Sequence, residues 1–218
     1  MAAILRANEI YRTLLGEGAR AGRPCVIVRL TGCNLRCAWC DSTYAYDDGR
    51  AMSLDEVGAE VDRLGPGPVL LTGGEPLLQD NARDLLARLC DAGREVLLET
   101  NGSLDVAGVD PRVARLVDVK CPGSGEASAM RWSNLDALGA GDEVKFVLAD
   151  RADFDYAMGV LAAHDLSGCS AVVLTPAAGR LGPAEPARWL LEAGEVPRNV
   201  RLGLQLHKII WPGVRRGV

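Results

Sequence analysis

Three cysteines lie within eight residues of one another, in the stretch GCNLRCAWCDS at positions 32–42. Cys33, Cys37 and Cys40 have the spacing Cx3Cx2C, and no fourth cysteine follows nearby. A four-iron cluster held by three thiolates keeps one iron free for an exchangeable ligand. A structural zinc site would need a fourth ligand, such as Cys25 or His207, and usually has paired short spacings. The spacing therefore favours a [4Fe-4S] cluster with one open iron over zinc.

A second motif, TGGEP at positions 72–76, follows an apolar run that is typical of a strand. Gly73 and Gly74 let the backbone approach a ligand closely, because glycine has no Cβ. Glu75 adds a carboxylate, which accepts hydrogen bonds from charged N–H donors. By itself the motif is also compatible with a simple turn. After a three-cysteine loop in the same chain, it indicates a strand end that binds a ligand.

Arg29 lies in the apolar run CVIVRL, at positions 25–30. A buried guanidinium without a partner is unfavourable, so Arg29 needs an anion. A structural ion pair satisfies that need, and so does a bidentate contact with a substrate carboxylate. Glu17, in the turn LLGEG, and Glu99, at the end of EVLLET, are carboxylates suited to the N–H donors of a ligand. A buried salt bridge is the alternative role for Glu99.

The elements that position these residues are short apolar runs alternating with longer amphipathic segments. Strands are predicted at 25–30, 68–72, 95–100, 116–120, 143–149, 171–176 and 200–206. Helices are predicted at 53–65, where Ser53 and Glu56 form a capping-box pattern, and at 81–93. Weaker helix candidates are 111–115, 132–138, 151–164 and 184–193. Near-continuous apolar strands are typical of a parallel sheet covered on both faces.

This alternation predicts an α/β fold with right-handed crossovers, in a single domain over residues 1–218. A closed eight-unit barrel takes about 250 residues, so we expect an incomplete, open (β/α) barrel of about six parallel strands. Active sites of such barrels lie at the carboxyl ends of the strands, and polar residues collect at these predicted ends. They are Thr72 to Glu75, Glu99 to Asn101, Lys120, Thr175 and Gln205 to His207.

The composition limits the partners and the cellular setting. The formal net charge is −5 and no long basic run occurs, so no nucleic-acid partner is expected. No apolar run approaches the roughly 20 residues that span a bilayer, and the N-terminus does not have the pattern of a signal peptide. Seven cysteines, four of them scattered singly, do not form a disulfide framework. We therefore expect a cytoplasmic protein with no membrane partner.

The Cx3Cx2C spacing followed by TGGEP resembles the radical S-adenosylmethionine enzymes. The resemblance implies that S-adenosylmethionine chelates the open iron of the [4Fe-4S] cluster and that its reductive cleavage gives a 5′-deoxyadenosyl radical. It places Trp39 near the adenine, although the ring also suits a hydrophobic prop for the loop. It places the ammonium group of the cofactor on the element formed by Gly73, Gly74 and Glu75.

A more specific resemblance covers nearly the whole chain and begins with NEIYRTLLGEGARAGRPCVIVRLTGCNLRCAWCDSTYAY. LTGGEPLLQ, LLETNGS, DVKCPGSG and LQLHK follow in order, and together these segments resemble the 7-carboxy-7-deazaguanine synthase family of the queuosine and 7-deazapurine pathway. The family implies a carbon–nitrogen lyase that converts 6-carboxy-5,6,7,8-tetrahydropterin into 7-carboxy-7-deazaguanine, with release of ammonia, by a radical ring contraction. It also implies Mg²⁺, catalytic use of S-adenosylmethionine, a flavodoxin-like reductant and a homodimer.

The same resemblance assigns roles to individual residues. Arg29 would bind the substrate carboxylate. Ser42 would be the protein ligand of Mg²⁺, with Thr43 as the second choice because many relatives have Thr in place of Ser42. The other substrate contacts would be Leu14, Leu15, Gly16, Glu17, Thr72, Glu99 and His207. The cofactor contacts would be Trp39, Gly73, Gly74, Glu75, Lys120, Thr175 and Gln205. Many relatives carry Gln where Leu15 stands, which backbone contacts tolerate, and the tail WPGVRRGV leaves open whether the chain end contacts the substrate.

Two other functions fit parts of the pattern. A glycyl-radical enzyme activase is also a short radical enzyme, but it acts on a partner protein and would need neither Mg²⁺ nor a carboxylate contact by Arg29. A non-catalytic iron–sulfur or zinc module would not consume S-adenosylmethionine.

Overall fold

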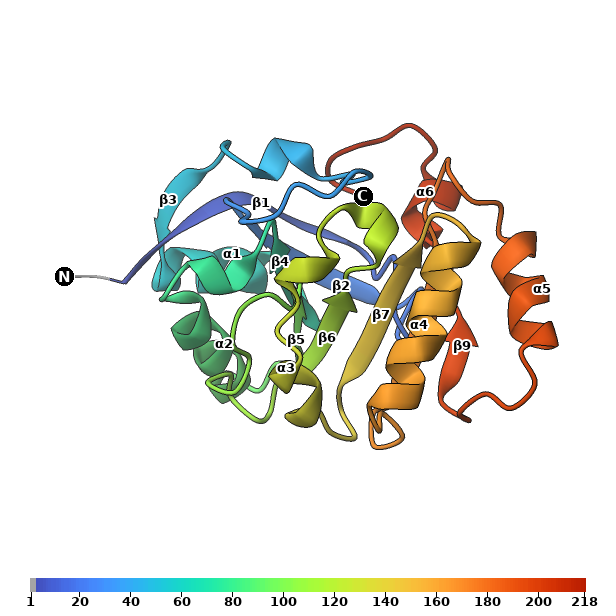
Figure 1. Cartoon of the computed structure of the whole chain (residues 1–218). Coiled ribbons are helices and arrows are strands. Elements are labelled where there is room, and N and C mark those ends of the chain that lie inside the picture. The colour runs from blue at the N-terminus through green and yellow to red at the C-terminus, as the bar shows by residue number, and fades with distance from the viewer. Residues whose placement is uncertain (1–2) are drawn as a thin grey trace.

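Nine strands form one sheet in the order β3-β1-β2-β4-β5-β6-β7-β8-β9, in a computed structural model that describes residues 3–218 (Figure 1). Pairing is parallel from β2 to β9 and antiparallel where β1 meets β2 and β3. The sheet does not close, because β3 and β9 lie at its opposite edges. The predicted incomplete, open (β/α) barrel is confirmed. The strands are β1 Ile4–Leu14, β2 Pro24–Leu30, β3 Arg50–Ser53, β4 Val69–Gly73, β5 Val96–Thr100, β6 Ala114–Val119, β7 Glu143–Leu148, β8 Ala171–Pro176 and β9 Val200–Leu202.

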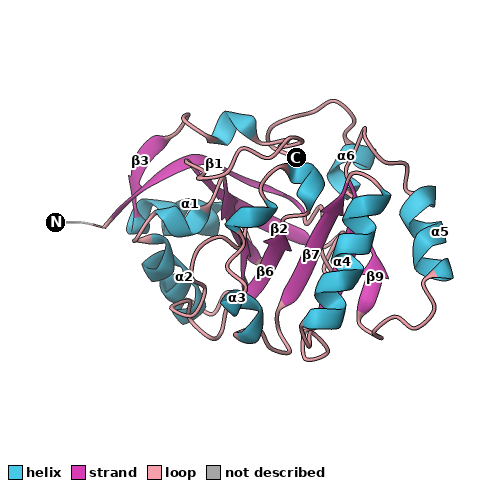
Figure 2. Ribbon diagram, in the orientation of Figure 1, coloured by secondary structure: helices cyan, strands magenta, loops and turns pink. Residues whose placement is uncertain are grey.

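Residues 3–218 contain six helices, and the first five cover the outer face of this sheet (Figure 2). The six are α1 Leu54–Leu64, α2 Ala82–Asp91, α3 Ser133–Asp136, α4 Arg151–Ala163, α5 Ala184–Glu192 and α6 Leu206–Ile210, with 3₁₀ turns η1 Thr43–Ala45, η2 Pro76–Leu78, η3 Pro122–Ser124 and η4 Ala127–Ala129. The predicted capping box of α1 is present: the Ser53 hydroxyl accepts from the Glu56 N–H at 3.2 Å, and the Glu56 carboxylate accepts from the Ser53 N–H at 2.7 Å. In residues 3–218, no helix has the length and apolar character to cross a membrane.

Three sequence predictions differ from the structure. Strands β1 and β3 were not predicted, because β1 mixes polar and apolar residues and β3 has only four residues. The helix predicted at 111–115 is wrong, since Ala114 already pairs with Leu97 of β5 and this pairing overrides the local pattern. The strand predicted at 200–206 ends at Leu202. Gly203 then lies against β8 and the chain turns into α6, so His207 is on a helix and not at a strand end.

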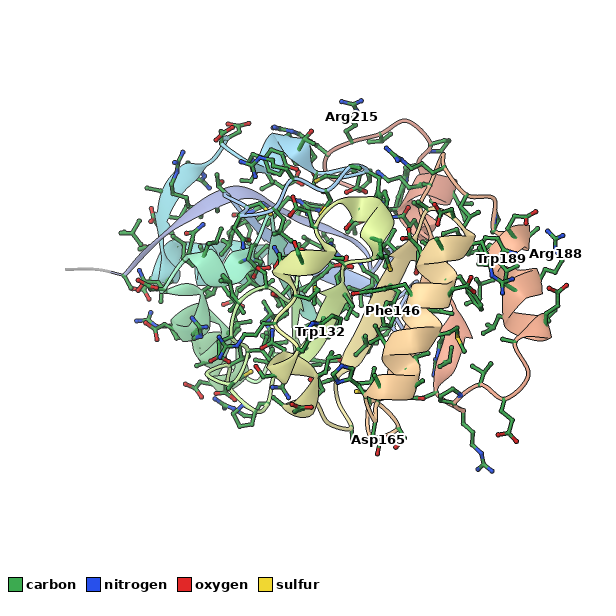
Figure 3. All side chains as sticks on the ribbon, viewed as in Figure 1. Trp132, Phe146, Asp165, Arg188, Trp189 and Arg215 are labelled. Atoms are coloured by element: carbon green, nitrogen blue, oxygen red, sulfur yellow. The ribbon has the colours of Figure 1, made fainter. Side chains whose placement is uncertain are left out.

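The two faces of the sheet have different roles, because successive side chains of a strand point to opposite sides. Outer-face residues form one apolar core under α1 and α2 and a second under α3, α4 and α5. Phe146 belongs to the second core and lies between the sheet and α4, whereas Arg188 and Arg215 point away from the ribbon (Figure 3). A small inner cluster of Leu15, Cys25, Ile27, Leu70 and Leu97 forms a floor inside the barrel. Above this floor the inner face is free to carry polar groups.

Candidate active site

The inner face of the sheet carries charged and polar residues around one pocket. Arg29 is paired with Thr72 between β2 and β4, and Asp118 with Lys145 between β6 and β7. Glu99, on β5 between these pairs, accepts a hydrogen bond from the Thr72 hydroxyl at 3.1 Å. All five line the pocket. Of the polar strand-end residues predicted to converge on one mouth, Glu75 and Thr175 do not line this pocket, whereas the others do: Thr72, Glu99, Thr100, Asn101, Lys120, Gln205 and His207.

The three-cysteine loop follows β2 and forms one end of this pocket. Cys33, Cys37 and Cys40 are free, half-buried thiols that line it, and no other cysteine of residues 3–218 does so. The described side chains include no group of three His, Cys, Asp or Glu placed to hold a single metal ion. Three free thiols at one end of one pocket are a donor set that fits a [4Fe-4S] cluster with one open iron.

Contacts from distant parts of the chain hold this loop in place. The Ala38 N–H donates to the Ser124 carbonyl at 3.0 Å, and the Ala38 carbonyl accepts from Arg180 at 2.8 Å. The Arg180 guanidinium also lies 5.4 Å from the ring centre of Trp39, a cation–π distance. Trp39 lines the pocket as predicted, whereas the role of Arg180 was not predicted. Arg180, which does not line the pocket, thus holds the Trp39 ring, which does.

In the TGGEP motif, the glycines face the pocket and the glutamate does not. Gly73 and Gly74 line it, whereas Glu75 is fully buried behind its wall. The Glu75 carboxylate accepts from the Thr100 hydroxyl at 2.9 Å and from the Asn101 N–H at 2.7 Å. The carboxylate predicted to receive a cofactor is therefore already paired within the chain. It joins the ends of β4 and β5 and so fixes the backbone of the two glycines.

Arg29 forms a structural ion pair and also lines the pocket. Its Nε donates to Glu9 at 2.9 Å and its Nη2 donates to the Tyr11 hydroxyl at 3.2 Å, so a structural ion pair is present. The same guanidinium lines the pocket. The tail also reaches this point, because the Tyr11 hydroxyl donates to the Val218 carbonyl at 3.1 Å. Glu9 and Tyr11 were not predicted, since they lie on the unpredicted strand β1.

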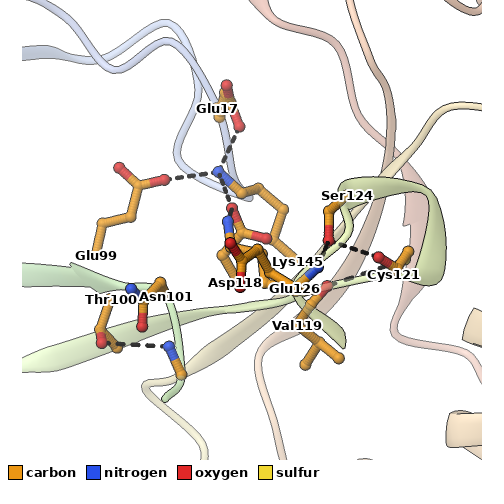
Figure 4. Close-up of polar contacts among 12 residues, drawn as sticks. Glu17, Glu99, Thr100, Asn101, Asp118, Val119, Cys121, Ser124, Glu126 and Lys145 are labelled. Atoms are coloured by element: carbon orange, nitrogen blue, oxygen red, sulfur yellow. Dashed lines mark hydrogen bonds and ion pairs between the residues drawn. The ribbon is translucent and has the colours of Figure 1, made fainter. Parts of the chain in front are cut away.

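Lys145 joins the acidic residues on the other side of the pocket. Its Nζ lies 2.6 Å from a carboxylate oxygen of Glu17, 2.6 Å from one of Glu99 and 3.3 Å from one of Asp118 (Figure 4). Burial is the largest single influence and raises the pKa of Glu99, but the charge and hydrogen bond of Lys145, the Thr72 hydrogen bond and the charge of Arg29 together outweigh it and lower the pKa from 4.5 to about 2. Gln205 donates to the second oxygen of Glu17 at 2.8 Å. Glu17, Glu99 and Gln205 therefore lie together at the pocket.

The turn after β1 meets α6 at the edge of the pocket. Leu14, Leu15 and Gly16 line the pocket, and the Gly16 carbonyl accepts from the Leu206 N–H at 2.9 Å. Both backbone polar groups of Leu15 are already paired, with Arg23 at 2.9 Å and with Gly22 at 2.8 Å. Gly16 lies against the His207 ring, where a Cβ would not fit. A small residue at position 16 therefore lets His207 reach the pocket.

Asp41 connects α6 to the loop that follows the cysteines. It accepts from Lys208 at 2.9 Å and from the Ser42 hydroxyl at 3.0 Å, and His207 Nε2 lies 3.4 Å away. Burial opposes ionisation of Asp41, but His207, Lys208 and Ser42 together hold its pKa well below the usual range. Ser42 lines the pocket, whereas Thr43 is exposed and begins η1. Ser42 is thus the better placed of the two hydroxyls.

The two remaining predicted cofactor contacts have different surroundings. Lys120 lines the pocket and its Nζ lies 3.0 Å from Asp118. Thr175 is fully buried under Gly203, outside the pocket lining, and its hydroxyl has no hydrogen-bond partner among the described residues.

Sequence reasoning missed Lys145 and Asp118, although the sequence contains a signal for both. Glu143 and Lys145 alternate with apolar residues in EVKFVL, and Asp118 interrupts LVDV in the same way. A charged residue at every second position of an otherwise buried strand indicates a polar inner face.

Comparisons with known proteins agree with this geometry. The family model described as the radical SAM superfamily matches residues 27–163. A 7-carboxy-7-deazaguanine synthase of Koribacter versatilis is 46% identical over 98% of this chain and 100% of its own length. One from Chlorobaculum tepidum is 42% identical over 98% of this chain and 97% of its own length. The crystal structure of QueE from Escherichia coli superposes with a TM-score of 0.76 at 25% identity, covering 93% of this chain and 94% of the other.

Proposed function

This chain belongs to the 7-carboxy-7-deazaguanine synthase family of the radical SAM superfamily, and we propose that its pocket converts 6-carboxy-5,6,7,8-tetrahydropterin into 7-carboxy-7-deazaguanine with release of ammonia. The observation that carries the proposal is one pocket whose lining contains three free thiols together with Arg29, Glu17 and Glu99. The relatives that match the whole chain are named as synthases, so an activase or a non-catalytic module is not favoured.

The decisive experiment is anaerobic reconstitution with iron and sulfide, followed by assay with the tetrahydropterin, S-adenosylmethionine, Mg²⁺ and a reductant. Formation of the 7-deazapurine is expected. Fully loaded enzyme that gives no such product would refute the proposed reaction.

We assign the cluster to Cys33, Cys37 and Cys40. When bound, the cluster and S-adenosylmethionine supply the 5′-deoxyadenosyl radical that starts the ring contraction. The cofactor contacts that line the pocket are Trp39, Gly73, Gly74, Lys120 and Gln205. Glu75 acts by fixing the glycines, and Thr175 is not retained as a direct contact because both side chains lie outside the lining. The task of these residues is to bind, orient and exclude water, since the difficult bond-breaking belongs to the cofactor.

For the substrate, Arg29 binds the carboxylate, while Glu17 and Glu99 accept hydrogen bonds from the amino and ring N–H groups of the pterin. Thr72 orients Glu99 through its hydroxyl. The other contacts come from Leu14, Leu15, Gly16 and His207, which line the pocket.

Replacing Arg29 with Lys is expected to raise KM for the tetrahydropterin about thirtyfold, since a charge-assisted bidentate contact contributes about 2 kcal/mol. Lysine keeps the charge but has no planar fork, and it also loses the contacts with Glu9 and Tyr11. Steady-state kinetics measures the change. The matched control is Arg63→Lys, at an exposed arginine of α1, which should leave KM unchanged. An unchanged KM in Arg29→Lys would reject the carboxylate contact.

We propose Ser42 as the protein ligand of Mg²⁺, with the remaining positions held by substrate oxygens and water. The Ser42 hydroxyl donates a hydrogen bond to Asp41 and lines the pocket, so its oxygen lone pairs remain available for a cation. Ser42→Ala is expected to raise the Mg²⁺ concentration for half-maximal turnover by roughly tenfold or more. Thr43→Ala is the matched control. A changed Mg²⁺ response in Thr43→Ala alone would transfer the role to Thr43.

We further propose lyase chemistry with catalytic use of S-adenosylmethionine, reduction by a flavodoxin-like donor, and a homodimer. Catalytic use requires fewer molecules of 5′-deoxyadenosine than of product in the same reaction. A cytoplasmic location stays a prediction.

A further inference from the structure

Lys145 is a buried lysine whose ammonium faces three carboxylates and, among residues 3–218, no other charged group at such short range. An ammonium has three N–H donors. The distances from Nζ are 2.6 Å to Glu17, 2.6 Å to Glu99 and 3.3 Å to Asp118 (Figure 4). The side chain of Lys145 is only 5% exposed. Its partners come from the turn after β1, from β5 and from β6, so this one group connects three separate segments.

Glu17 and Glu99 are each held on both carboxylate oxygens. Besides Lys145, Glu17 accepts from Gln205 at 2.8 Å, and Glu99 accepts from Thr72 at 3.1 Å. Each carboxylate oxygen can accept more than one hydrogen bond, so both retain capacity toward the pocket that they line. Without Lys145, several ionised carboxylates would share a partly dry site, which is strongly unfavourable.

We propose that Lys145 is a positioning residue for the pterin ring, holding Glu17 and Glu99 as a pair of ionised acceptors, one on each side of its ammonium. The ring amino and N–H groups are donors, and so is the ammonium; Lys145 therefore acts through the two glutamates. This inference rests on the proposed function for the identity of the ligand. It adds a residue that the strand register places beside Asp118, on the opposite side of the pocket from Arg29.

The charges around this group determine the expected pH dependence. Glu17, Glu99 and Asp118 face Lys145, Lys120 lies 3.0 Å from Asp118, and Arg29 acts on Glu99 from β2. The pKa of Glu99 is lowered from the usual 4.5 to about 2, so its contribution to stability is present above pH 4.5 and is lost as the pH falls toward 2. Without Lys145, burial, which is already the largest single influence on Glu99, raises the pKa of that carboxyl. In a variant without Lys145, the pH dependence of the free energy of unfolding therefore has the opposite sign, and stability is lost as the pH rises.

The test uses Lys145→Met, which keeps the length of the side chain and removes the charge. The ligand is 6-carboxypterin, the aromatic analogue of the substrate, and its fluorescence reports binding between about pH 5.5 and pH 7, where the pterin ring keeps its N–H proton. The reconstituted wild type should bind with an affinity that changes little over this range. The variant should bind on the order of tenfold more weakly or worse near pH 6 and recover part of the loss as the pH rises and the glutamates ionise.

A second measurement does not depend on the ligand. The thermal midpoint of Lys145→Met should be lower than that of the wild type at about pH 8.5, and the difference should narrow at about pH 6. The double variant Lys145→Met/Glu99→Gln should regain thermal stability, because it no longer has the buried carboxylate at position 99. It should not regain affinity for 6-carboxypterin. Arg63→Met, which breaks an exposed pair with Glu60, should match the wild type in both measurements.

The outcomes separate this inference from the proposed function. Wild-type enzyme that makes no 7-deazapurine refutes the function, while the pH dependence of stability still tests Lys145. A Lys145→Met enzyme with the affinity, stability and pH profiles of the wild type overturns the inference. Weaker binding with the same loss at every pH also overturns it, because Lys145 would then only fill space.

Discussion

Enzyme carrying Cys37→Ala is expected to bind far less iron than the wild type after anaerobic reconstitution and to form no detectable 7-deazapurine. Three thiols are the minimum for the proposed cluster, so the loss of one removes the cofactor that supplies the radical chemistry. Cys37 is the best of the three to remove. In the described part of the chain its sulfur takes part in no hydrogen bond, whereas the Cys33 sulfur accepts from the Leu35 N–H at 3.4 Å.

The measurements are iron and sulfide content per chain, the visible absorption of the cluster, and 5′-deoxyadenosine after reduction with S-adenosylmethionine. Cys90→Ala is the matched control, because Cys90 lies on α2 away from the pocket and should leave iron content and turnover unchanged. A Cys37→Ala enzyme that keeps the wild-type iron content and activity would show that this loop does not hold the cluster.

The parts of the fold that the sequence predicts well are those in which local pattern and tertiary structure agree. Strands β2, β4, β5, β7 and β8 are apolar runs that end near the predicted residues. The capping box of α1 is a local signal and is present. Strand β1 has no such signal: ILRANEIYRTL owes its structure to pairing on both sides, with β2 and with β3.

The residues of the candidate site are likewise predictable only where a local sequence pattern indicates them. The cysteines and glycines were predictable because their chemistry is confined to one short segment. The partners of Arg29 were not, since Glu9 and Tyr11 belong to β1 and meet Arg29 only through the antiparallel register. Arg180 lies far along the chain from Ala38, and no local pattern indicates that contact. Glu75 shows a related limit: its motif was recognised, but the partners of its buried carboxylate, Thr100 and Asn101, lie at the end of another strand.

Gly74→Ala is expected to reduce turnover about a hundredfold, because a catalytic group displaced by about 1 Å can lose that much rate. A Cβ on Gly74 would lie 2.6 Å from Cys33 Cβ and would also meet the Gly32 carbonyl, whereas ordinary contacts begin near 3.4 Å. The obstacle is backbone and a cluster ligand, so neither can rotate away as a flexible side chain would. Either the three-cysteine loop or the end of β4 must move. Turnover, iron content and the free energy of unfolding are measured on the same preparation, with a loss of stability of about 3 kcal/mol expected from overpacking.

Gly58→Ala provides the control for the added methyl group. Gly58 lies within α1, with nothing within 4 Å of a Cβ, and a helical glycine replaced by alanine gains roughly 0.5–1 kcal/mol of stability. The same chemical change should therefore stabilise the protein at position 58 and disable it at position 74. If Gly74→Ala kept wild-type turnover and iron content, the close packing of the TGGEP turn against the cysteine loop would not be required for catalysis. If it lost turnover while its iron content stayed normal, the displaced group would be the cofactor contact at Gly73 and Gly74 and not the cluster itself.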